Sequence, residues 1–488
     1  MNKLLTLVLS LCWIQHAAAQ LAKIQVTLDS SVTQALKGRL YIFSTTDTAK
    51  TVQDPDPFNP SPLFYIDVDN WLGGQVRVLD PSAPAYPVNM LELKPGHYKF
   101  AAVFDIDTIE RNNTATAGNW YSRDVKVEIR QGSPAEIQIK LNRRIPSRAF
   151  RESETIKQVN LRSELVSAFH KRDAFIKAGI VLPKNYWQDS LKTYPVVFII
   201  PGWGGTHYDA ANPNTAKRYG FEWGKEKIYV YLNPETQTRF GLHAFIDSRV
   251  NGPWGKALVH ELIPYIEKTY RVKRDPNYRF LVGQSSGGYG VLWLQMNYPA
   301  QFGGCWAVSP DPVDFSDFTS VDLYRKDVNI YYDQEGKERP FFSMNGTYLS
   351  TIKKFAQLED FLGDGGQMQS FEAAFGLPDK KGRPRQLFDR QSGKISKEVV
   401  KSWEAYDLGK VLVKKFSKSK SLIEGKIHLY AGADDNFFLN RPVEIFIKKA
   451  ATQQIKISGE LIKGANHWSI WNEGFTKRVQ QEIDDCIR

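Results

Sequence analysis

The 488-residue sequence predicts an α/β domain with a mostly parallel sheet, preceded by a smaller all-β domain. Two observations predict this order. Short runs that alternate apolar and polar side chains fill the chain from Lys23 to about Leu141, whereas after residue 145 apolar strands alternate with helical patterns. A period of two is typical of antiparallel strands with one buried face, and strands separated by helices are typical of parallel sheets. The length also fits two domains.

The chain begins with a segment typical of a secretory signal peptide. Lys3 precedes an apolar run, Leu4–Ile14, and three small residues end at Ala19. This pattern predicts a cleaved signal over residues 1–19 and a secreted or periplasmic protein. No later run approaches the roughly eighteen apolar residues of a membrane span, so we expect no integral membrane segment.

Residues 20–145 are expected to form a β-sandwich of immunoglobulin-like type. The alternating runs are rich in Val, Ile, Tyr and Phe, and Asp, Pro and Gly separate them; they include "KIQVTLD", "GRLYIFST", "HYKFAAVFDI" and "AEIQIKLN". Such spacing is typical of sandwiches. His97 is the only histidine in this region and no acid-base cluster converges on it, so we expect a structural or binding role.

Residues 146–488 are expected to form the α/β domain. The apolar run Tyr194–Gly202 is typical of a strand that is buried on both faces of a parallel sheet. Between about residues 311 and 425 the alternation of strands and helices is lost, and helical patterns fit best at Leu349–Phe361 and Lys397–Lys415. We interpret 311–425 as an insertion that folds over the carboxyl edge of the sheet as a cap; an insertion without a role at the site is the alternative.

Charge and cysteine content exclude some classes of protein. The formal net charge is +11, but basic residues are spread along the chain apart from Lys380–Arg385 and Lys414–Lys420, so we expect no nucleic-acid partner. The predicted mature chain keeps Cys305 and Cys486, which are either one disulfide or include a buried free thiol at Cys305. Two cysteines are too few for a zinc or redox site.

The stretch "RFLVGQSSGGYG" contains a candidate nucleophile. Ser285 follows a predicted strand and precedes a predicted helix, between Gly283 and Gly287. Glycines at these positions let a serine occupy a tight, strained turn that points its hydroxyl outwards. The motif Gly-x-Ser-x-Gly is common by chance, so the expectation depends on partners elsewhere in the chain.

A serine hydroxyl needs a general base, and the base needs an orienting acid. Asp435 lies three residues after Gly432 at a strand end, with Asp434 as the alternative acid. His467 follows on a loop before the last predicted helix, so the order is Ser, Asp, His. His207 lies in an earlier loop and has no acid downstream that would pair with it in this order.

The oxyanion hole is expected to use two backbone N–H groups, that of Ser286 and that of Trp203 in "PGWGG". Gly202 and the glycines after it would let the backbone approach a ligand. Tryptophans lie next to the predicted site loops, and Trp254 and Trp468 are tentative substrate contacts with Gly202. Aromatic faces suit sugar rings or phenolic groups, although tryptophans under helices are as often part of the core.

These residues resemble the putative-esterase family of α/β-hydrolases, which includes esterase D, feruloyl and acetylxylan esterases and enterochelin esterases. The resemblance covers about Ala174 to the C-terminus, interrupted by the insertion. It is carried by "PGWGG", "NGPW", "ELIPYIEKTYRV", "VGQSSGGYG", "GADDNFF" and "GANHWSIW". The chain differs from the family in Pro201, where a histidine is common, in Ser286, where a methionine is frequent, and in its long insertion.

The resemblance implies an α/β-hydrolase fold and serine-esterase chemistry by Ser285, Asp435 and His467, with no metal or organic cofactor. The expected partner is an acylated polysaccharide, an oligosaccharide or a small ester, and a feruloyl or acetyl carbohydrate esterase is the leading interpretation. Alternatives are a siderophore esterase, a peptidase of related fold and a non-catalytic glycan-binding protein.

Overall fold

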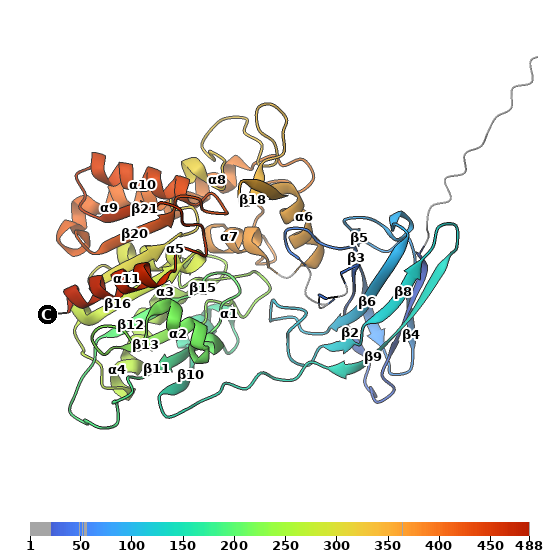
Figure 1. Cartoon of the computed structure of the whole chain (residues 1–488), viewed down its shortest axis with the longest axis horizontal. Helices are drawn as coiled ribbons and strands as arrows, with labels where there is room; N and C mark the ends of the chain where they lie inside the picture. The colour runs from blue at the N-terminus through green and yellow to red at the C-terminus, as the bar shows by residue number, and fades with distance from the viewer. Residues whose placement is uncertain (1–20, 48, 51, 53–55, 364, 488) are drawn as a thin grey trace, which may run out of the picture. The chain divides into compact units, whose positions relative to one another are not determined.

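A computed structural model describes residues 21–47, 49–50, 52, 56–363 and 365–487 of the chain (Figure 1). The predicted signal peptide, residues 1–19, lies outside the described residues. The chain divides into two compact units. The segment Thr108–Asn112 belongs with Arg148 and the residues after it to the second unit, and the other described residues up to Ser147 belong to the first.

The first unit is a nine-stranded sheet in the order β4-β1-β9-β7-β6-β2-β3-β5, with β8 paired to β6. Its strands are β1 (Leu21–Leu28), β2 (Leu36–Thr45), β3 (Leu63–Trp71), β4 (Val76–Leu79), β5 (Ala85–Tyr86), β6 (Gly96–Asp105), β7 (Trp120–Ser122), β8 (Val125–Ile129) and β9 (Ala135–Arg144).

The alternating pattern of these strands produces one buried face. In β9, Ile137, Ile139 and Leu141 are buried while the residues between them are exposed. They belong to one apolar cluster with Trp71 and Phe104, whose rings meet edge to face. The strand pairs are antiparallel as predicted, except that β1 and β9 are parallel. The first unit is therefore all-β, with strands between Leu21 and Arg144, and its immunoglobulin-like type stays a prediction.

The second unit contains an eight-stranded sheet in the order β10-β11-β13-β12-β16-β17-β20-β21. The run from β13 to β21 is parallel, and β10 and β11 form an antiparallel edge. The predicted mostly parallel sheet is thus confirmed. The strands are β10 (Ile156–Arg162), β11 (Phe175–Val181), β12 (Val196–Ile200), β13 (Ile228–Leu232), β16 (Arg279–Gln284), β17 (Gly304–Val308), β20 (Ile427–Gly432) and β21 (Ser458–Ile462).

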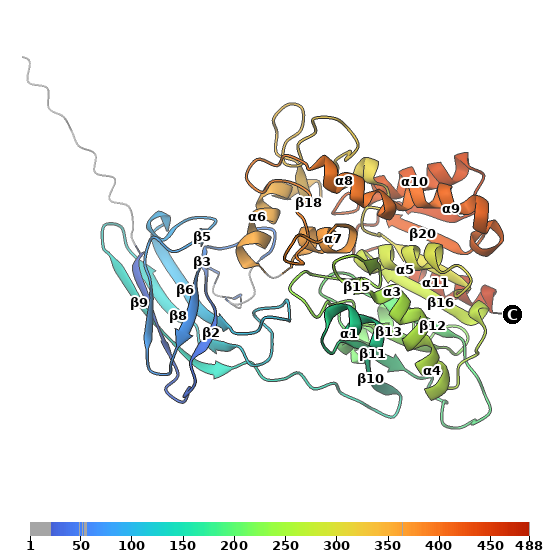
Figure 2. The same ribbon diagram turned by 180° about the vertical axis from the view of Figure 1, so that it is seen from behind.

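Helices cover both faces of this sheet, which explains why its central strands are apolar throughout. On one face, α2 (Pro213–Tyr219) and α11 (Glu473–Cys486) pack on the strands through Tyr219, Phe475 and Val479. On the other, α5 (Ser286–Asn297) contacts β16 and β17, and α10 (Asn440–Thr452) contacts β20. Figure 1 shows α11 in front of the sheet, and Figure 2, which views the molecule from behind, shows α5 in front of it.

The order of the strands sets the place of the site. From β12 the chain goes outward to β13 and then crosses to β16 on the other side of β12, through α3 (Trp254–Ala257), a π-helical turn (Leu258–Leu262) and α4 (Ile263–Thr269). The strand order therefore reverses between β12 and β16. Parallel sheets bind ligands beyond the carboxyl ends of the strands at such a point, and Gly202 and Ser285 both follow there.

The insertion has more regular structure than its sequence predicts. It contains a hairpin, β18 (Pro340–Met344) and β19 (Thr347–Thr351), and helices α6 (Ile352–Leu362), α7 (Gln367–Phe375), α8 (Lys397–Trp403) and α9 (Leu408–Ile423). The helical pattern predicted from Leu349 begins later, because Thr351 ends β19 and caps α6 through its side chain. The pattern from Lys397 is two helices, because Asp407 interrupts it and caps α9.

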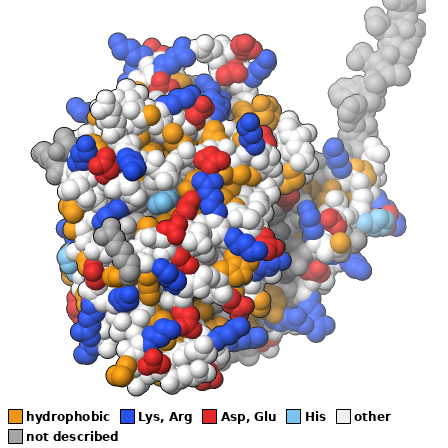
Figure 3. Space-filling view, turned by 60° about the vertical axis from the view of Figure 1, so that its left-hand side comes forward, with side chains coloured by type: hydrophobic (Ala, Val, Ile, Leu, Met, Phe, Trp, Pro, Cys, Tyr) orange, Lys and Arg blue, Asp and Glu red, His pale blue; other side chains and the backbone are white. Residues whose placement is uncertain are grey.

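Within the described residues, every helix is too short or too polar to cross a lipid bilayer. Cys305 is a free and fully buried thiol, which is one of the two states that the sequence predicts. Burial raises the pKa of Cys305 well above the usual range, so the thiol is unreactive. Lys and Arg side chains lie interspersed with Asp and Glu over the face drawn in Figure 3.

Candidate active site

Ser285 occupies a strained turn between a buried strand and a buried helix. β16 ends at Gln284 and α5 begins at Ser286, which leaves Ser285 alone between them with φ 56° and ψ −125°. Residues with a Cβ rarely adopt a positive φ, and strain of this kind is found at functional sites. The turn is held by two backbone hydrogen bonds, from Ser285 N–H to Val308 and from Asp311 N–H to the Ser285 carbonyl, each 3.1 Å long.

The flanking glycines are required by close backbone approach. A Cβ on Gly283 would lie 2.3 Å from the carbonyl oxygen of Gly287, and a Cβ on Gly287 would lie 1.9 Å from that of Ile200. Both distances are shorter than any normal contact. The two glycines thus let α5 start directly against the ends of β16 and β12.

His467 and Asp435 form a buried pair at the same edge of the sheet. His467 Nδ1 lies 2.8 Å from Asp435 Oδ2, and the exposed fractions of the two side chains are 6% and 0%. The other Asp435 oxygen accepts the N–H groups of Phe437 and Leu439 at 2.9 and 3.3 Å. The carboxylate is therefore fixed, and it can hold the imidazole with Nδ1 as the donor and Nε2 as the acceptor.

The loop that carries His467 is fixed from two sides. Gln284, the residue before the candidate nucleophile, donates its side-chain amide to the His467 carbonyl at 2.6 Å. Asn436, the residue after Asp435, accepts the His467 N–H at 3.1 Å. The elbow, the acid loop and the histidine loop are thus linked through neighbours of the three predicted residues.

The alternative acid, Asp434, and the alternative base, His207, take no part in the pair of His467 and Asp435. Asp434 is exposed to solvent, and Asp435 is the residue that contacts the histidine. His207 is buried against Phe150 and bonds Gln158 through Nε2 at 3.3 Å. Burial lowers the pKa of His207 to about 4, which makes it a poor base near neutral pH.

The predicted oxyanion loop lies directly beside the elbow. A Cβ built on Gly202 would lie 3.1 Å from Ser285 Cβ and 3.8 Å from its Oγ, so Gly202 lets the loop after β12 approach the serine. Ser286 is the first residue of α5, so its N–H belongs to the free amino end of that helix. Trp203 is 39% exposed, and the Arg111 guanidinium lies over its ring, 5.0 Å from the centroid.

The tryptophans near the site divide into core and surface residues. Trp254 is 2% exposed, stacks on His243 with ring centroids 3.7 Å apart, and donates its indole N–H to Asn251 at 2.8 Å. Its ring stacking and its N–H are both used in the core, so these contacts do not support the predicted contact of Trp254 with substrate. Trp468 is 42% exposed and meets the His467 ring edge to face at 5.6 Å, so it stays a candidate contact.

Two polar residues that the motifs did not indicate lie at the nucleophile. Asp311 Oδ1 is 3.4 Å from Ser285 Oγ. The side-chain amide of Gln367, the first residue of α7 in the insertion, donates to Asp311 Oδ2 at 3.1 Å and to Ser286 Oγ at 3.2 Å. A signal existed for Asp311, which follows β17 by three residues at the same sheet edge; Gln367 had none.

Asp311 is a buried carboxyl group without a Lys or Arg partner among the described residues. It is 6% exposed, and no Lys or Arg of the described part of the chain forms a salt bridge with it. Burial raises its pKa to about 6, although hydrogen bonds from Ser286, Ser285 and Gln367 and the charge of His467 act in the opposite direction. A carboxyl group that titrates this close to neutral pH is typical of functional sites.

The insertion also touches the other side of the site. The β18 residue Ser343 exchanges two hydrogen bonds with Asn436, one to its carbonyl at 2.9 Å and one from its side-chain amide at 2.7 Å. Phe342 packs on Trp468, with ring centroids 5.8 Å apart. The insertion therefore contacts both the nucleophile end and the histidine end of the site.

The nucleophile and the base are not engaged with each other in this state. Among the described residues, the hydroxyl of Ser285 lies within hydrogen-bond distance of Asp311, and no hydrogen bond joins it to His467. Catalytic hydrogen bonds often tighten only when a substrate is bound. The described residues also contain no group of three His, Cys, Asp or Glu side chains arranged to hold a metal ion.

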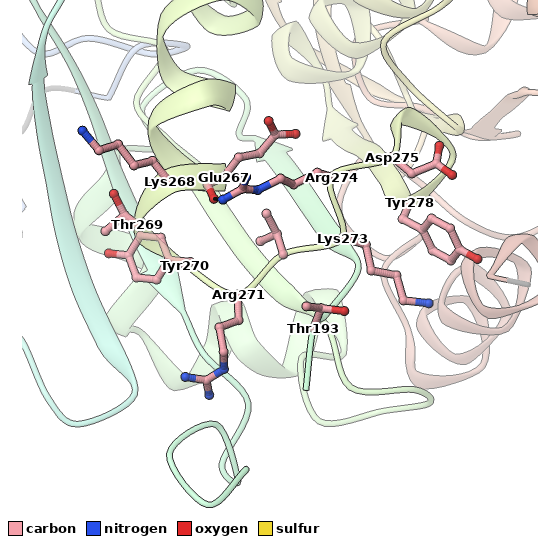
Figure 4. A pocket seen from close by; sticks show the side chains of 11 residues that line it. Thr193, Glu267, Lys268, Thr269, Tyr270, Arg271, Lys273, Arg274, Asp275 and Tyr278 are labelled. Carbon is pink, nitrogen blue, oxygen red and sulfur yellow. Dashed lines mark hydrogen bonds between the residues drawn. The ribbon is translucent and has the colours of Figure 1, made fainter. Parts of the chain in front are cut away.

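A separate hollow of about 690 Å³ lies at the opposite edge of the sheet (Figure 4). Thr193 precedes β12 and Tyr278 precedes β16, whereas Gly202 and Ser285 follow these strands. The hollow is lined by Thr193, Glu267, Lys268, Thr269, Tyr270, Arg271, Val272, Lys273, Arg274, Asp275 and Tyr278. It is therefore not part of the candidate site.

The parallel sheet, the strained serine after β16 and the histidine–aspartate pair after β20 and β21 together define an α/β-hydrolase. A family model described as "Putative esterase" matches residues 170–481, and the chain belongs to this family. Family membership confirms the predicted resemblance and supports ester hydrolysis as the activity.

Several solved structures show a distant likeness to part of this chain. A ferulic acid esterase is 16% identical, with 68% of this chain and 98% of that chain covered and a TM-score of 0.44. An S-formylglutathione hydrolase from Agrobacterium tumefaciens is 15% identical, with 68% of this chain and 95% of that chain covered and a TM-score of 0.40. A ferulic acid esterase from Anaeromyces mucronatus, in complex with ferulic acid, is 14% identical, with 70% of this chain and 96% of that chain covered and a TM-score of 0.35. At these values no substrate is transferred from those proteins to this chain.

Proposed function

We propose that the protein is a serine carboxylic-ester hydrolase that works through an acyl-enzyme, with Ser285 as nucleophile, His467 as base and Asp435 as orienting acid. The observation that carries the proposal is the strained Ser285 turn. A positive φ is unfavourable for a serine, and close backbone contacts require the glycines near it on both sides. An ordinary corner between a strand and a helix does not need this strained conformation. The buried His467–Asp435 pair at the same sheet edge supplies the partners for it.

In the proposed reaction His467 Nε2 accepts the proton of the Ser285 hydroxyl as Oγ attacks the ester carbonyl. Asp435 holds Nδ1–H and stabilises the imidazolium that forms. The N–H groups of Ser286 and Trp203 would bind the oxyanion. His467 then protonates the leaving alcohol, and it activates the water that releases the acid and restores Ser285.

A carbohydrate ester with a feruloyl or acetyl group is the substrate class that we propose. Trp203 and Trp468 are about 40% exposed on the loops that carry the second oxyanion donor and the base. An exposed aromatic face close to the reacting atoms suits a sugar ring or a phenolic acyl group. A secreted or periplasmic location, predicted from residues 1–19, would give access to an acylated polysaccharide.

The test compares the wild type with a Ser285→Ala variant on p-nitrophenyl acetate and methyl ferulate. We expect kcat/KM on both esters to fall by at least about 10³-fold in the variant, because the nucleophile is removed. Ser402→Ala is the matched control. Ser402 lies on α8 and bonds the Val399 carbonyl of its own helix, so its loss should leave the rates unchanged. Equal rates from wild type and Ser285→Ala would refute the serine mechanism.

A further inference from the structure

Asp311 is a second carboxylate at the nucleophile, besides the one that orients His467. Its Oδ1 is the acceptor within hydrogen-bond distance of Ser285 Oγ. Its backbone N–H bonds the Ser285 carbonyl, so carboxylate and nucleophile are held together by the main chain as well. The motif that identifies Ser285 does not require such a group.

A carboxylate at this place opposes the proposed reaction when it is ionised. It competes with His467 Nε2 for the Ser285 proton, since a hydroxyl donates one hydrogen bond at a time. It also places a negative charge beside Ser286, whose N–H is the proposed oxyanion donor, and like charges in a buried site repel strongly. Within the described part of the chain, the side chains that donate hydrogen bonds to Asp311 are the neutral groups of two serines and Gln367, which do not cancel its charge.

We propose that Asp311 is a positioning residue that, when ionised, holds the Ser285 hydroxyl away from His467, and that its protonation releases the hydroxyl for attack. Gln367 from the insertion keeps the carboxylate in this place by donating to Asp311 and to Ser286. The inference rests on the proposed serine-esterase function, and it gives the insertion a part in setting the pH dependence of the nucleophile.

Two titratable side chains, those of His467 and Tyr289, interact electrostatically with Asp311. His467 acts on it through its charge, and Tyr289 on α5 lies close enough to feel the charge of Asp311. Burial raises the pKa of Tyr289 well above the usual range, and its hydroxyl bonds the Tyr406 carbonyl, so it stays neutral near physiological pH. Asp311, with a pKa of about 6, is therefore the group whose change of charge is used here.

The direction of the pH effect follows from the titration of Asp311. Below its pKa of about 6 the carboxyl is neutral, and the amide introduced by Asp311→Asn would closely mimic it. Above this pH the wild type carries the charge and the Asp311→Asn variant does not. The ratio of kcat/KM for Asp311→Asn to that for wild type should be near one in acid, and it should rise through the titration of Asp311.

The experiment measures kcat/KM for p-nitrophenyl acetate from about pH 4.5 to about pH 9 in both proteins. We expect Asp311→Asn to be about tenfold faster than wild type at the alkaline end and equal to it at the acid end. Asp434→Asn is the control, since it removes an exposed charge from the same sheet edge, and its ratio should not depend on pH. A ratio for Asp311→Asn that is constant with pH, or below one at alkaline pH, overturns the proposal.

A second variant leaves Asp311 in place. Gln367→Leu removes a hydrogen bond to the ionised carboxylate, which raises the pKa of Asp311 further. The restraint on Ser285 should then begin at a higher pH than in wild type, and an unchanged midpoint counts against the proposal. Ser285→Ala separates the two hypotheses: if it is inactive while the Asp311→Asn ratio stays flat, only the role of Asp311 fails.

Discussion

At the scale of single residues, the site depends on how Asp435 is held. Its carboxylate accepts the N–H groups of Phe437 and Leu439 and the Nδ1 proton of His467, and its side chain is fully buried. A buried carboxylate that accepts three hydrogen bonds cannot rotate freely. It therefore fixes both the orientation and the tautomer of the imidazole.

We predict that Asp435→Asn lowers kcat by about 10²–10⁴-fold, because an amide can favour the wrong tautomer of His467. KM should change much less, since the substrate does not contact this carboxylate. Asp434→Asn changes an exposed neighbour by the same chemistry and should keep nearly full activity. Steady-state kinetics on p-nitrophenyl acetate decide between the two acids, and a loss confined to Asp434→Asn would contradict the assignment.

At the scale of elements, the start of α5 is the most constrained point of the fold. The helix begins against the ends of β12 and β16 with no room for a side chain at Gly287, where a Cβ would meet the Ile200 carbonyl at 1.9 Å. Most of the helix is buried on every side, including residues Ser286–Met296. The position of the nucleophile is thus set by close backbone packing.

We predict that Gly287→Ala destabilises the protein by about 2–4 kcal/mol and removes most of the activity, since backbone must move to admit the Cβ. Urea unfolding and esterase activity measure the two effects. Gly474→Ala is the control. It lies in α11, and the nearest atom to its added Cβ is 3.4 Å away, so the change should be neutral or slightly stabilising. Full stability of Gly287→Ala would show that the turn can relax.

The aromatic contacts between β18 and the histidine loop form a second element of the site. Trp468 is partly exposed and packs on Phe342 and on the His467 ring. Its position suits binding of the ester and not proton transfer.

We predict that Trp468→Ala raises KM for methyl ferulate by about three- to tenfold and leaves kcat within about twofold, because a stacking surface is lost in both the ground state and the transition state. Trp187→Ala is the matched control. Trp187 is 55% exposed, and its indole N–H bonds the Glu154 carbonyl. A fall in kcat without a change in KM would instead indicate that Trp468 orients His467.

At the scale of the whole molecule, the acidic side chain of Glu482 adds polar contacts between α11 and the sheet of the second unit. Glu482 accepts hydrogen bonds from Trp306 on β17 and from Tyr430 on β20, and it pairs with His428 and Arg478. Burial raises the pKa of Glu482, but these hydrogen bonds outweigh it and bring the pKa to about 2.

This pKa predicts acid sensitivity. Because the pKa of Glu482 is lower in the folded chain than its ordinary value of 4.5, its stabilisation is present above about pH 4.5 and is lost as the pH falls towards 2. Glu482→Gln should remove about 1–2 kcal/mol at neutral pH, after allowance for solvent screening, and less in acid. Thermal unfolding from neutral to acidic pH tests this, with the exposed Glu473→Gln as control; an equal loss at every pH would contradict it.

The sequence determined the order and the local geometry of the proposed site. Apolar runs predicted the parallel strands, and strand-to-helix switches placed Ser285, Asp435 and His467 at strand ends in the order typical of the family. These features could be predicted because buried parallel strands and tight turns restrict residue types locally. The hairpin β18–β19 was not predicted, since its alternation is short and Thr351 joins it directly to a helix.

Only the tertiary structure decided which distant side chains join these residues. Gln367 is 81 residues from Ser286, and the periodicity of apolar residues in the sequence does not indicate that α7 begins beside the nucleophile. Trp254 lies next to a site loop in the sequence but is enclosed by His243 and Asn251. Whether a side chain faces solvent, a ligand or the core depends on packing between segments, and local sequence patterns do not carry that information. The contact between Asp311 and Ser285, from which we infer a restraint on the nucleophile, is likewise set by packing between segments.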